Sequence, residues 1–96
     1  PDYHNNKADL LNKLGRYEEA LNEVEIALRL NPNDPFYHST KAVALAHLGN
    51  CGEALEEVDR ALKLTNEAGT DIMQEDIEEI RKDINEVKSI CSRNRT

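Results

Sequence analysis

A period of 34 residues organises the first two thirds of the chain and constrains its fold more than any other feature. Residues 15–34 read GRYEEALNEVEIALRLNPND, and a degenerate copy, GNCGEALEEVDRALKLTNEA, begins at Gly49. Aligned without gaps, residues 1–34 and residues 35–68 are identical at sixteen positions. A period of this length is typical of arrays in which each structural unit packs on its neighbours. The sequence therefore predicts a repeat architecture.

Each unit is expected to contain two amphipathic helices. Most identical positions are apolar or small and lie three, four or seven residues apart, which is the spacing of the stripe that such a helix buries. In the first helix this stripe consists of Ala8, Leu11 and Leu14. Gly15 follows as a stop that tolerates a positive φ angle, and Asp34 is placed to cap the third helix. The predicted helices cover residues 3–14, 17–30, 36–48 and 52–64.

The ends of these helices resemble the tetratricopeptide repeat (TPR). The matching features are the Leu14-Gly15 end of the first helix, the Tyr-Glu-Glu-Ala-Leu start of the second at residues 17–21, and the Asn-Pro-Asn exit at residues 31–33. The resemblance covers residues 1–68. It implies an all-α fold, an α-solenoid built from two TPR-like helix-turn-helix repeats.

The last segment departs from the repeat and predicts one long helix that ends near Ser92. Its apolar residues alternate steps of four and three, at Met73, Ile77, Ile80, Ile84, Val87 and Cys91. We expect about five helices in one domain. Residues 1–34 form the first repeat, residues 35–68 the second, and residues 69–96 a long C-terminal capping helix.

The charge of the chain restricts the kind of partner. The net charge is −7, and none of the three segments is basic. Proteins that bind nucleic acids or anionic membrane surfaces draw much of their affinity from Lys and Arg, so neither partner is expected. The sequence favours a protein or peptide partner that is neutral or basic.

The two cysteines bear on the redox compartment. Cys51 and Cys91 lie in different segments and lack the Cys-x-x-Cys spacing of a zinc or thioredoxin-like site. We interpret both as free thiols, and a single disulfide is the alternative. Together with the lack of a signal peptide or a long apolar run, free thiols predict a reducing, cytoplasmic setting.

The TPR resemblance also implies a binding site. TPR arrays usually bind an extended peptide or a partner helix on the concave surface that the first helix of each unit lines. Asn side chains can pair with a peptide backbone, and apolar side chains add contact area. The alternative for these positions is a solvated helix surface. The predicted concave-face residues are Asn5, Asp9, Asn12, Phe36, Ser39, Val43, Met73 and Ile77.

Catalytic and metal-binding signatures are not found in the sequence. No nucleophile is paired with a base, and there is neither a Gly-rich phosphate loop nor a zinc motif. His4 and His38 are repeat-equivalents on different helices, and His47 has no histidine four residues away. We therefore expect no enzyme activity, no metal and no cofactor.

The function predicted from the sequence is a protein–protein interaction module, a TPR-like scaffold that binds a peptide or helix on its concave face. The main alternative is a structural module that self-associates as a homodimer through the last helix, if the second half of that helix stays exposed. A third reading makes the chain a regulatory segment of a larger enzyme. The residues that would form the homodimer interface are Ile84, Val87, Ile90 and Cys91.

Overall fold

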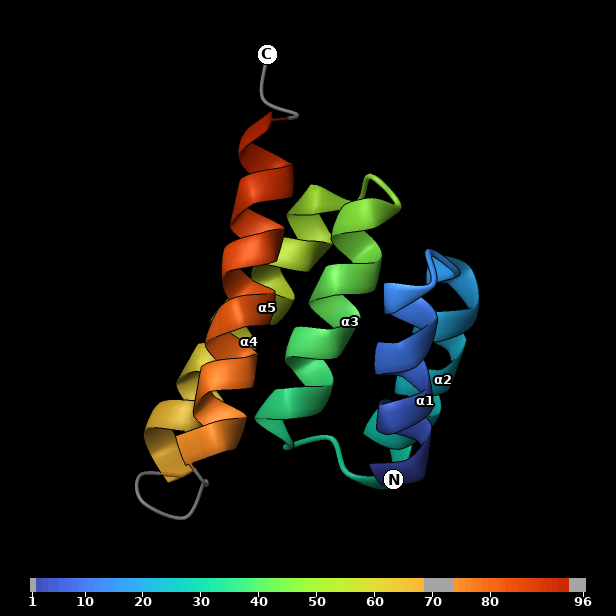
Figure 1. The fold of residues 1–96 in the computed structure, drawn as a ribbon. Coiled ribbons are helices and arrows are strands. Elements are labelled where there is room, and N and C mark those ends of the chain that lie inside the picture. Colours follow the sequence, from blue (N-terminus) through green and yellow to red (C-terminus); the bar gives the residue numbers. More distant parts are fainter. Residues whose placement is uncertain (1, 69–73, 94–96) are drawn as a thin grey trace.

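The computed structural model describes residues 2–68 and 74–93, and these residues form five α-helices (Figure 1). Within the described ranges all regular structure is helical, which confirms the predicted all-α array of two helix-turn-helix units followed by a long helix. None of the described helices is both long and apolar enough to cross a membrane. The helices are α1 (Asp2–Lys13), α2 (Tyr17–Leu30), α3 (Pro35–His47), α4 (Cys51–Ala68) and α5 (Gln74–Arg93).

A glycine ends the first helix of each unit. Gly15 and Gly49 have φ angles of 79° and 88°, a left-handed conformation that other residues adopt at a cost. Beyond α1, the backbone N–H of Arg16 donates to the carbonyl of Leu11 at 2.9 Å, and that of Gly15 donates to the carbonyl of Asn12 at 3.1 Å. These bonds satisfy carbonyls that the helix end leaves open. The predicted glycine stop is confirmed.

The second unit begins at a capped helix, as the sequence predicts. Asp34 precedes α3, and its side chain accepts a hydrogen bond from the N–H of Phe36 at 2.8 Å. Pro35 takes the first helical position, where a missing N–H leaves no hydrogen bond unmade. The local signals Asp-Pro and Gly therefore fix where α3 starts and where α1 ends.

A buried polar group ties the turn between α2 and α3 to α4. The two ring nitrogens of His38 lie 2.7 Å from the carbonyl oxygen of Pro32 and 3.2 Å from the carboxylate of Glu57. Burial raises the pKa of Glu57, but the hydrogen bond and charge of His38 and the charge of Lys41 outweigh it, so that the pKa lies below its ordinary value. The equivalent group in the first unit consists of His4, Lys7 and Glu23. Both histidines, His4 and His38, therefore serve the packing of the units.

The helix α3 is the centre of the molecule. It lies between the α1–α2 pair and the α4–α5 pair (Figure 1), and one core cluster joins it to each pair. Ala20 and Ala27 on α2, and Ala54 and Ala61 on α4, are fully buried. Such short side chains allow helix backbones to approach closely. The small residues shared by the two repeats therefore form the seams of the core.

The position of α5 differs from that of a third repeat. Of the two helices of the unit before it, α5 packs more along α3 than along α4, whereas α3 packs more along α2 than along α1. Ile80, Ile84, Val87 and Cys91 point into the cluster between α3 and α4 and are buried there. The last helix therefore seals the array and is displaced toward the first helix of the second unit.

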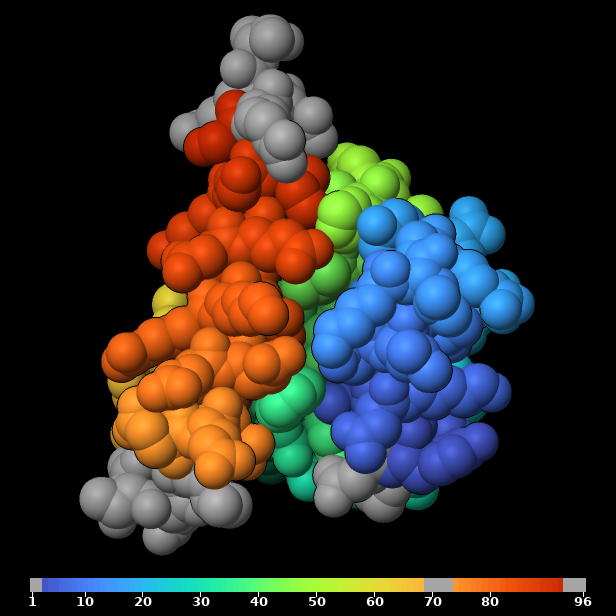
Figure 2. All heavy atoms as spheres, in the orientation of Figure 1, coloured from blue at the N-terminus to red at the C-terminus, as the bar shows by residue number. Residues whose placement is uncertain are grey.

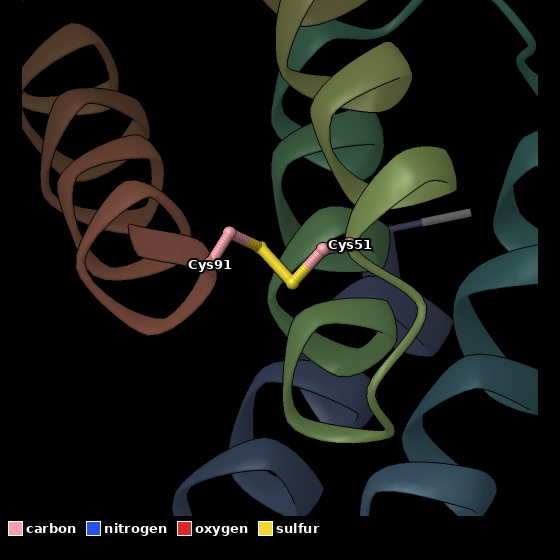
Figure 3. The surroundings of a disulfide bond; sticks show 2 residues. All are labelled: Cys51 and Cys91. Atoms are coloured by element: carbon pink, nitrogen blue, oxygen red, sulfur yellow. A yellow bond between two sulfur atoms is a disulfide. The ribbon is translucent and has the colours of Figure 1, made fainter. Parts of the chain in front are cut away.

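Cys51 and Cys91 form a disulfide, so the prediction of two free thiols is wrong (Figure 3). The bond joins the first residue of α4 to the last turn of α5, and the two Cα atoms lie 5.6 Å apart. The cysteines are separated by 40 residues, and the packing of α5 beside α4 brings them together. Because the cytoplasmic assignment rested on free thiols, it loses that support and stays a prediction.

Candidate functional site

A cleft of about 260 Å³ lies between α1 and α5, and α3 forms its floor. Figure 2 shows it as a hollow between α5, drawn in orange, and α1, drawn in blue. The backbones of α1 and α5 make no direct contact in the described part of the chain, so side chains alone span the gap. The cleft is lined by Asp9, Asn12, Lys13, Tyr17, Val43, His47, Glu79, Lys82, Asp83 and Glu86.

Three carboxylates from two helices converge in this cleft. Oxygen atoms of Asp9 on α1 and of Glu79 and Asp83 on α5 all lie within 4.8 Å of one another. The Nζ of Lys13 lies 3.1 Å from a carboxylate oxygen of Asp9, and this hydrogen bond raises the pKa of Lys13. Asp83 is buried, and its carboxylate accepts a hydrogen bond of 3.3 Å from the hydroxyl group of Ser39. The cluster therefore concentrates negative charge, and little water reaches its buried member, Asp83.

The environment of Asp83 changes its protonation. Burial, followed by the charges of Asp9 and Glu79 and a smaller effect of Glu86, raises the pKa of Asp83 to about 7, although the hydrogen bond from Ser39 opposes the shift. An unfolded chain has no such environment, so its Asp83 ionises near the ordinary pKa of 3.8. The folded protein thus retains a proton on Asp83 over a range in which the unfolded chain has lost it.

This difference predicts how stability depends on pH. Between the two pKa values of Asp83, 3.8 unfolded and about 7 folded, the folded state binds more protons, so the free energy of unfolding falls as the pH rises. Asp83→Asn removes this dependence, and we expect it to stabilise the chain by on the order of 2 kcal/mol at pH 8. Urea unfolding of both proteins at pH 5 and pH 8 measures the effect. A parallel pH dependence in the two proteins would contradict it.

The opposite edge of the cleft is built from α2, α3 and α5. The ring of Tyr17 stacks on that of His47, with centroids 4.1 Å apart and planes 5° from parallel. The Nε2 of His47 in turn lies 2.7 Å from a carboxylate oxygen of Glu86. These contacts hold the start of α2 and the end of α3 beside α5.

A buried amide forms part of the floor. Asn12 is only 8% exposed, and its Nδ2 donates to the carbonyl oxygen of Thr40 at 3.2 Å. Its Oδ1 is buried and has no hydrogen-bond partner among the residues that the structure describes. Buried polar atoms are almost always hydrogen-bonded, so this oxygen is an acceptor that a donor or a cation could use.

The predicted concave-face residues are only partly available for binding. Asn5, Asn12, Ser39 and Val43 are buried, and Asp9, Phe36 and Ile77 are half-buried. Met73 lies outside the described residues. For Ser39 and Val43 the physical reason is the displaced α5, which lies over the face of α3 that was expected to be open. Of the predicted set, Asp9, Asn12 and Val43 line the cleft.

The premise of the self-association hypothesis is wrong. Ile84, Val87 and Cys91 are 4%, 0% and 7% exposed, and Ile90 is half-buried against the same core cluster. The alternating stripe of α5 faces α3 and α4 of its own chain. It is therefore not available to a second copy while the chain is folded in this way.

An exposed apolar stripe on α1 was missed by the sequence analysis. Tyr3, Leu10 and Leu14 are 69%, 57% and 62% exposed, and their spacing of seven and four places them on one side of the helix. Leu14 was expected in the buried stripe. The alignment of the two 34-residue units could have identified the stripe. In it, Tyr3, Leu10 and Leu14 align with Tyr37, Ala44 and Leu48 of the second unit.

Comparison with known proteins identifies the family of the first unit. Residues 1–34 match the model of the tetratricopeptide repeat. No curated protein and no solved structure matches the chain. The matched segment contains α1, the glycine turn and α2, the helix-turn-helix unit that the sequence predicted. The match therefore supports the assignment of residues 1–34 to the tetratricopeptide repeat.

Proposed function

We propose that the chain is a protein-interaction module that holds a helix of a partner protein along the outer stripe of α1, formed by Tyr3, Leu10 and Leu14. A TPR suggests a protein–protein interaction module in general. The proposal for α1 rests on one observation: the repeat-equivalent surface of α3 is an interface inside the same chain.

The internal interface supplies the template. Tyr37 and Ala44 on α3 are 2% and 0% exposed and belong to the core cluster that α3 shares with α1 and α2. Their counterparts on α1 are Tyr3 and Leu10, which no described residue covers. The two units share their backbone plan, and the α1–α2 pair packs against α3. A helix pair similar to α1–α2 would therefore fit against the outer side of α1 in the same way.

The template also indicates the chemistry of the partner helix. The helix that receives α3 is α2, which presents the short buried side chains Ala20, Val24 and Ala27. Leu10 is larger than its counterpart Ala44, so the partner needs Gly or Ala opposite it to avoid overpacking. Lys7 and Lys13 are the exposed cations of α1. An amphipathic helix with a small-residue seam and acidic flanks meets these requirements.

A tandem fusion tests whether the stripe accepts such a helix. A second copy of residues 1–34 is placed directly before Pro1, so that its final Asp precedes Pro1 as Asp34 precedes Pro35. With Leu10→Ala to match Ala44, we expect the added unit to dock on α1 and raise the unfolding temperature by roughly 5 °C or more, since each added repeat contributes an interface. Hydrogen exchange in α1 should slow at least tenfold. Thermal unfolding and exchange mass spectrometry provide the readouts.

The matched control is the same fusion with Leu10→Glu and Leu14→Glu. These substitutions should abolish the gain, but in the original chain they should change stability by no more than about 0.5 kcal/mol because both positions are exposed. Equal exchange in α1 with and without the added unit would contradict the proposal. A dimer of the original chain in sedimentation equilibrium that Leu10→Glu and Leu14→Glu dissociate would show instead that the occupant is a second copy.

The other functional predictions keep their place as predictions. One is the binding of a peptide or helix on the concave face, and a neutral or basic partner would suit the carboxylates of the cleft. The residues predicted for this binding are Asn5, Asp9, Asn12, Phe36, Ser39, Val43, Met73 and Ile77. The TPR family consists generally of interaction scaffolds, in line with the expectation that the chain is not an enzyme. A regulatory role within a larger enzyme, a homodimer and a cytoplasmic location also stay predictions.

A further inference from the structure

We propose that the cleft between α1 and α5 is a Ca²⁺ site, with Asp9 and Asn12 of α1 and Glu79 and Asp83 of α5 as its protein ligands. This site is separate from the outer stripe of α1 and does not depend on the proposed function. It also revises the expectation of no metal, which considered the histidines and the zinc motifs of the sequence.

The oxygen geometry suits a single cation. Ca²⁺ takes carboxylate and amide oxygens at about 2.3–2.6 Å, so two oxygens on the same ion are separated by at most about 5 Å. The carboxylate oxygens of Asp9, Glu79 and Asp83 already lie within 4.8 Å of one another. One ion between the helices can therefore contact all three with small side-chain adjustments. Solvent completes the coordination through the open side of the cleft.

The second and independent observation is the unpartnered oxygen of Asn12. Its Nδ2 is engaged by Thr40 at 3.2 Å, which leaves Oδ1 as the free atom of a side chain that is 92% buried, being 8% exposed. Asn12 lines the same cleft as the three carboxylates. A neutral amide oxygen together with three carboxylates is a donor set that hard cations prefer.

The charge around the cluster favours a bound cation. Asp83 is buried, and its carboxylate lies close to those of Asp9 and Glu79, so the three negative charges repel one another. Lys13 is the ammonium already beside Asp9, at 3.1 Å, and its side chain is 64% exposed. It is therefore free to swing into solvent when an ion enters. Lys13 acts as a competitor of the cation rather than as part of its site.

The spacing explains how two helices build one site. Asp9 and Asn12 are three residues apart on α1, and Glu79 and Asp83 are four apart on α5, so each pair shares a helix face. The backbones of α1 and α5 do not touch in the described part of the chain. A bound ion would bridge them across the cleft and connect the first helix of the array to the last.

Terbium luminescence tests the site directly. Tb³⁺ replaces Ca²⁺ at oxygen sites, and Tyr17, which lines the cleft, is placed to sensitise its emission. We expect saturable emission that Ca²⁺ displaces with a Kd of about 10⁻⁴ M, the range of open, partly solvated sites, and less effective displacement by Mg²⁺. Calorimetric titration with CaCl₂ measures the same affinity without the probe. Tyr17→Phe should remove the emission and leave the calorimetric affinity unchanged.

Variants identify the ligands. Asp9→Asn, Glu79→Gln and Asp83→Asn should each weaken Ca²⁺ binding at least tenfold, whereas Lys13→Met should tighten it several-fold. Asp59→Asn is the matched control, because Asp59 lines a separate depression on the outer face of α4. Circular dichroism verifies the fold of each variant. Asp9→Asn and Glu79→Gln, at half-buried positions, keep the test valid if Asp83→Asn does not fold. Undetectable Ca²⁺ binding, or binding unchanged in Asp9→Asn and Glu79→Gln, would overturn the proposal.

Discussion

Reduction of the Cys51–Cys91 disulfide is expected to lower the free energy of unfolding by about 4 kcal/mol. The bond closes a loop between residues that are 40 apart, and opening it restores conformational entropy to the unfolded chain. For a chain of 96 residues, each kcal/mol corresponds to roughly 4–8 °C in the unfolding temperature. The midpoint should therefore drop by roughly 15–30 °C. Thermal unfolding followed by circular dichroism, with and without a phosphine reductant, measures this drop.

The variant Cys51→Ala/Cys91→Ala separates the bond from side effects of the reductant. It should unfold at the midpoint of the reduced parent and should not respond to reductant. The loss should begin at the end of α5, because the bond fastens its last turn to the start of α4 (Figure 3). Two titratable thiols in the folded, unreduced protein, or equal midpoints for the oxidised and reduced chains, would show that the disulfide does not contribute in this way.

The helices and their ends could be predicted from the sequence because they depend on local signals. Gly15 takes the left-handed angle at the end of α1, and the side chain of Asp34 caps α3. The stripe through Ile80, Ile84 and Val87 likewise indicates which side of α5 is buried. Each of these inferences needs only the chain within a few residues of the position concerned.

The path of α5 could not be predicted, because the 34-residue period ends before this helix begins. Nothing in the spacing decides whether α5 packs mainly on α3 or on α4. That choice determines the disulfide, the burial of Ser39 and Val43, and the meeting of Asp9 with Asp83. The candidate cleft was therefore largely hidden from sequence reasoning, although three of its residues had been named.

The exposure of Leu14 has a different origin. Periodicity shows that a residue belongs to an apolar stripe, but a helix in a repeat array has one stripe toward its own unit and another toward the neighbouring unit. Leu11 belongs to the first and is 6% exposed, while Leu14 belongs to the second and is 62% exposed. A single sequence pattern merges the two stripes. The structure separates them, and the outer one becomes a candidate interface.

Val87→Asp is expected to have the largest effect of any single substitution discussed for this chain. Val87 is 0% exposed in the cluster between α3, α4 and α5. The substitution removes a packed aliphatic side chain and places a carboxylate where no partner is available. We expect a loss of about 4 kcal/mol or more in the free energy of unfolding, measured by urea unfolding of the oxidised chain at pH 7.

Leu14→Asp is the matched control, because it introduces the same charge at an aliphatic position that is 62% exposed. Its effect on stability should stay within about 0.5 kcal/mol. The contrast also distinguishes the two roles considered for the last helix. If α5 served self-association through an exposed face, Val87→Asp would leave the monomer as stable as the parent and would dissociate a dimer. A sealing helix requires the opposite result, in which the fold is lost and no dimer precedes that loss, because the stripe of α5 is already occupied by its own repeats.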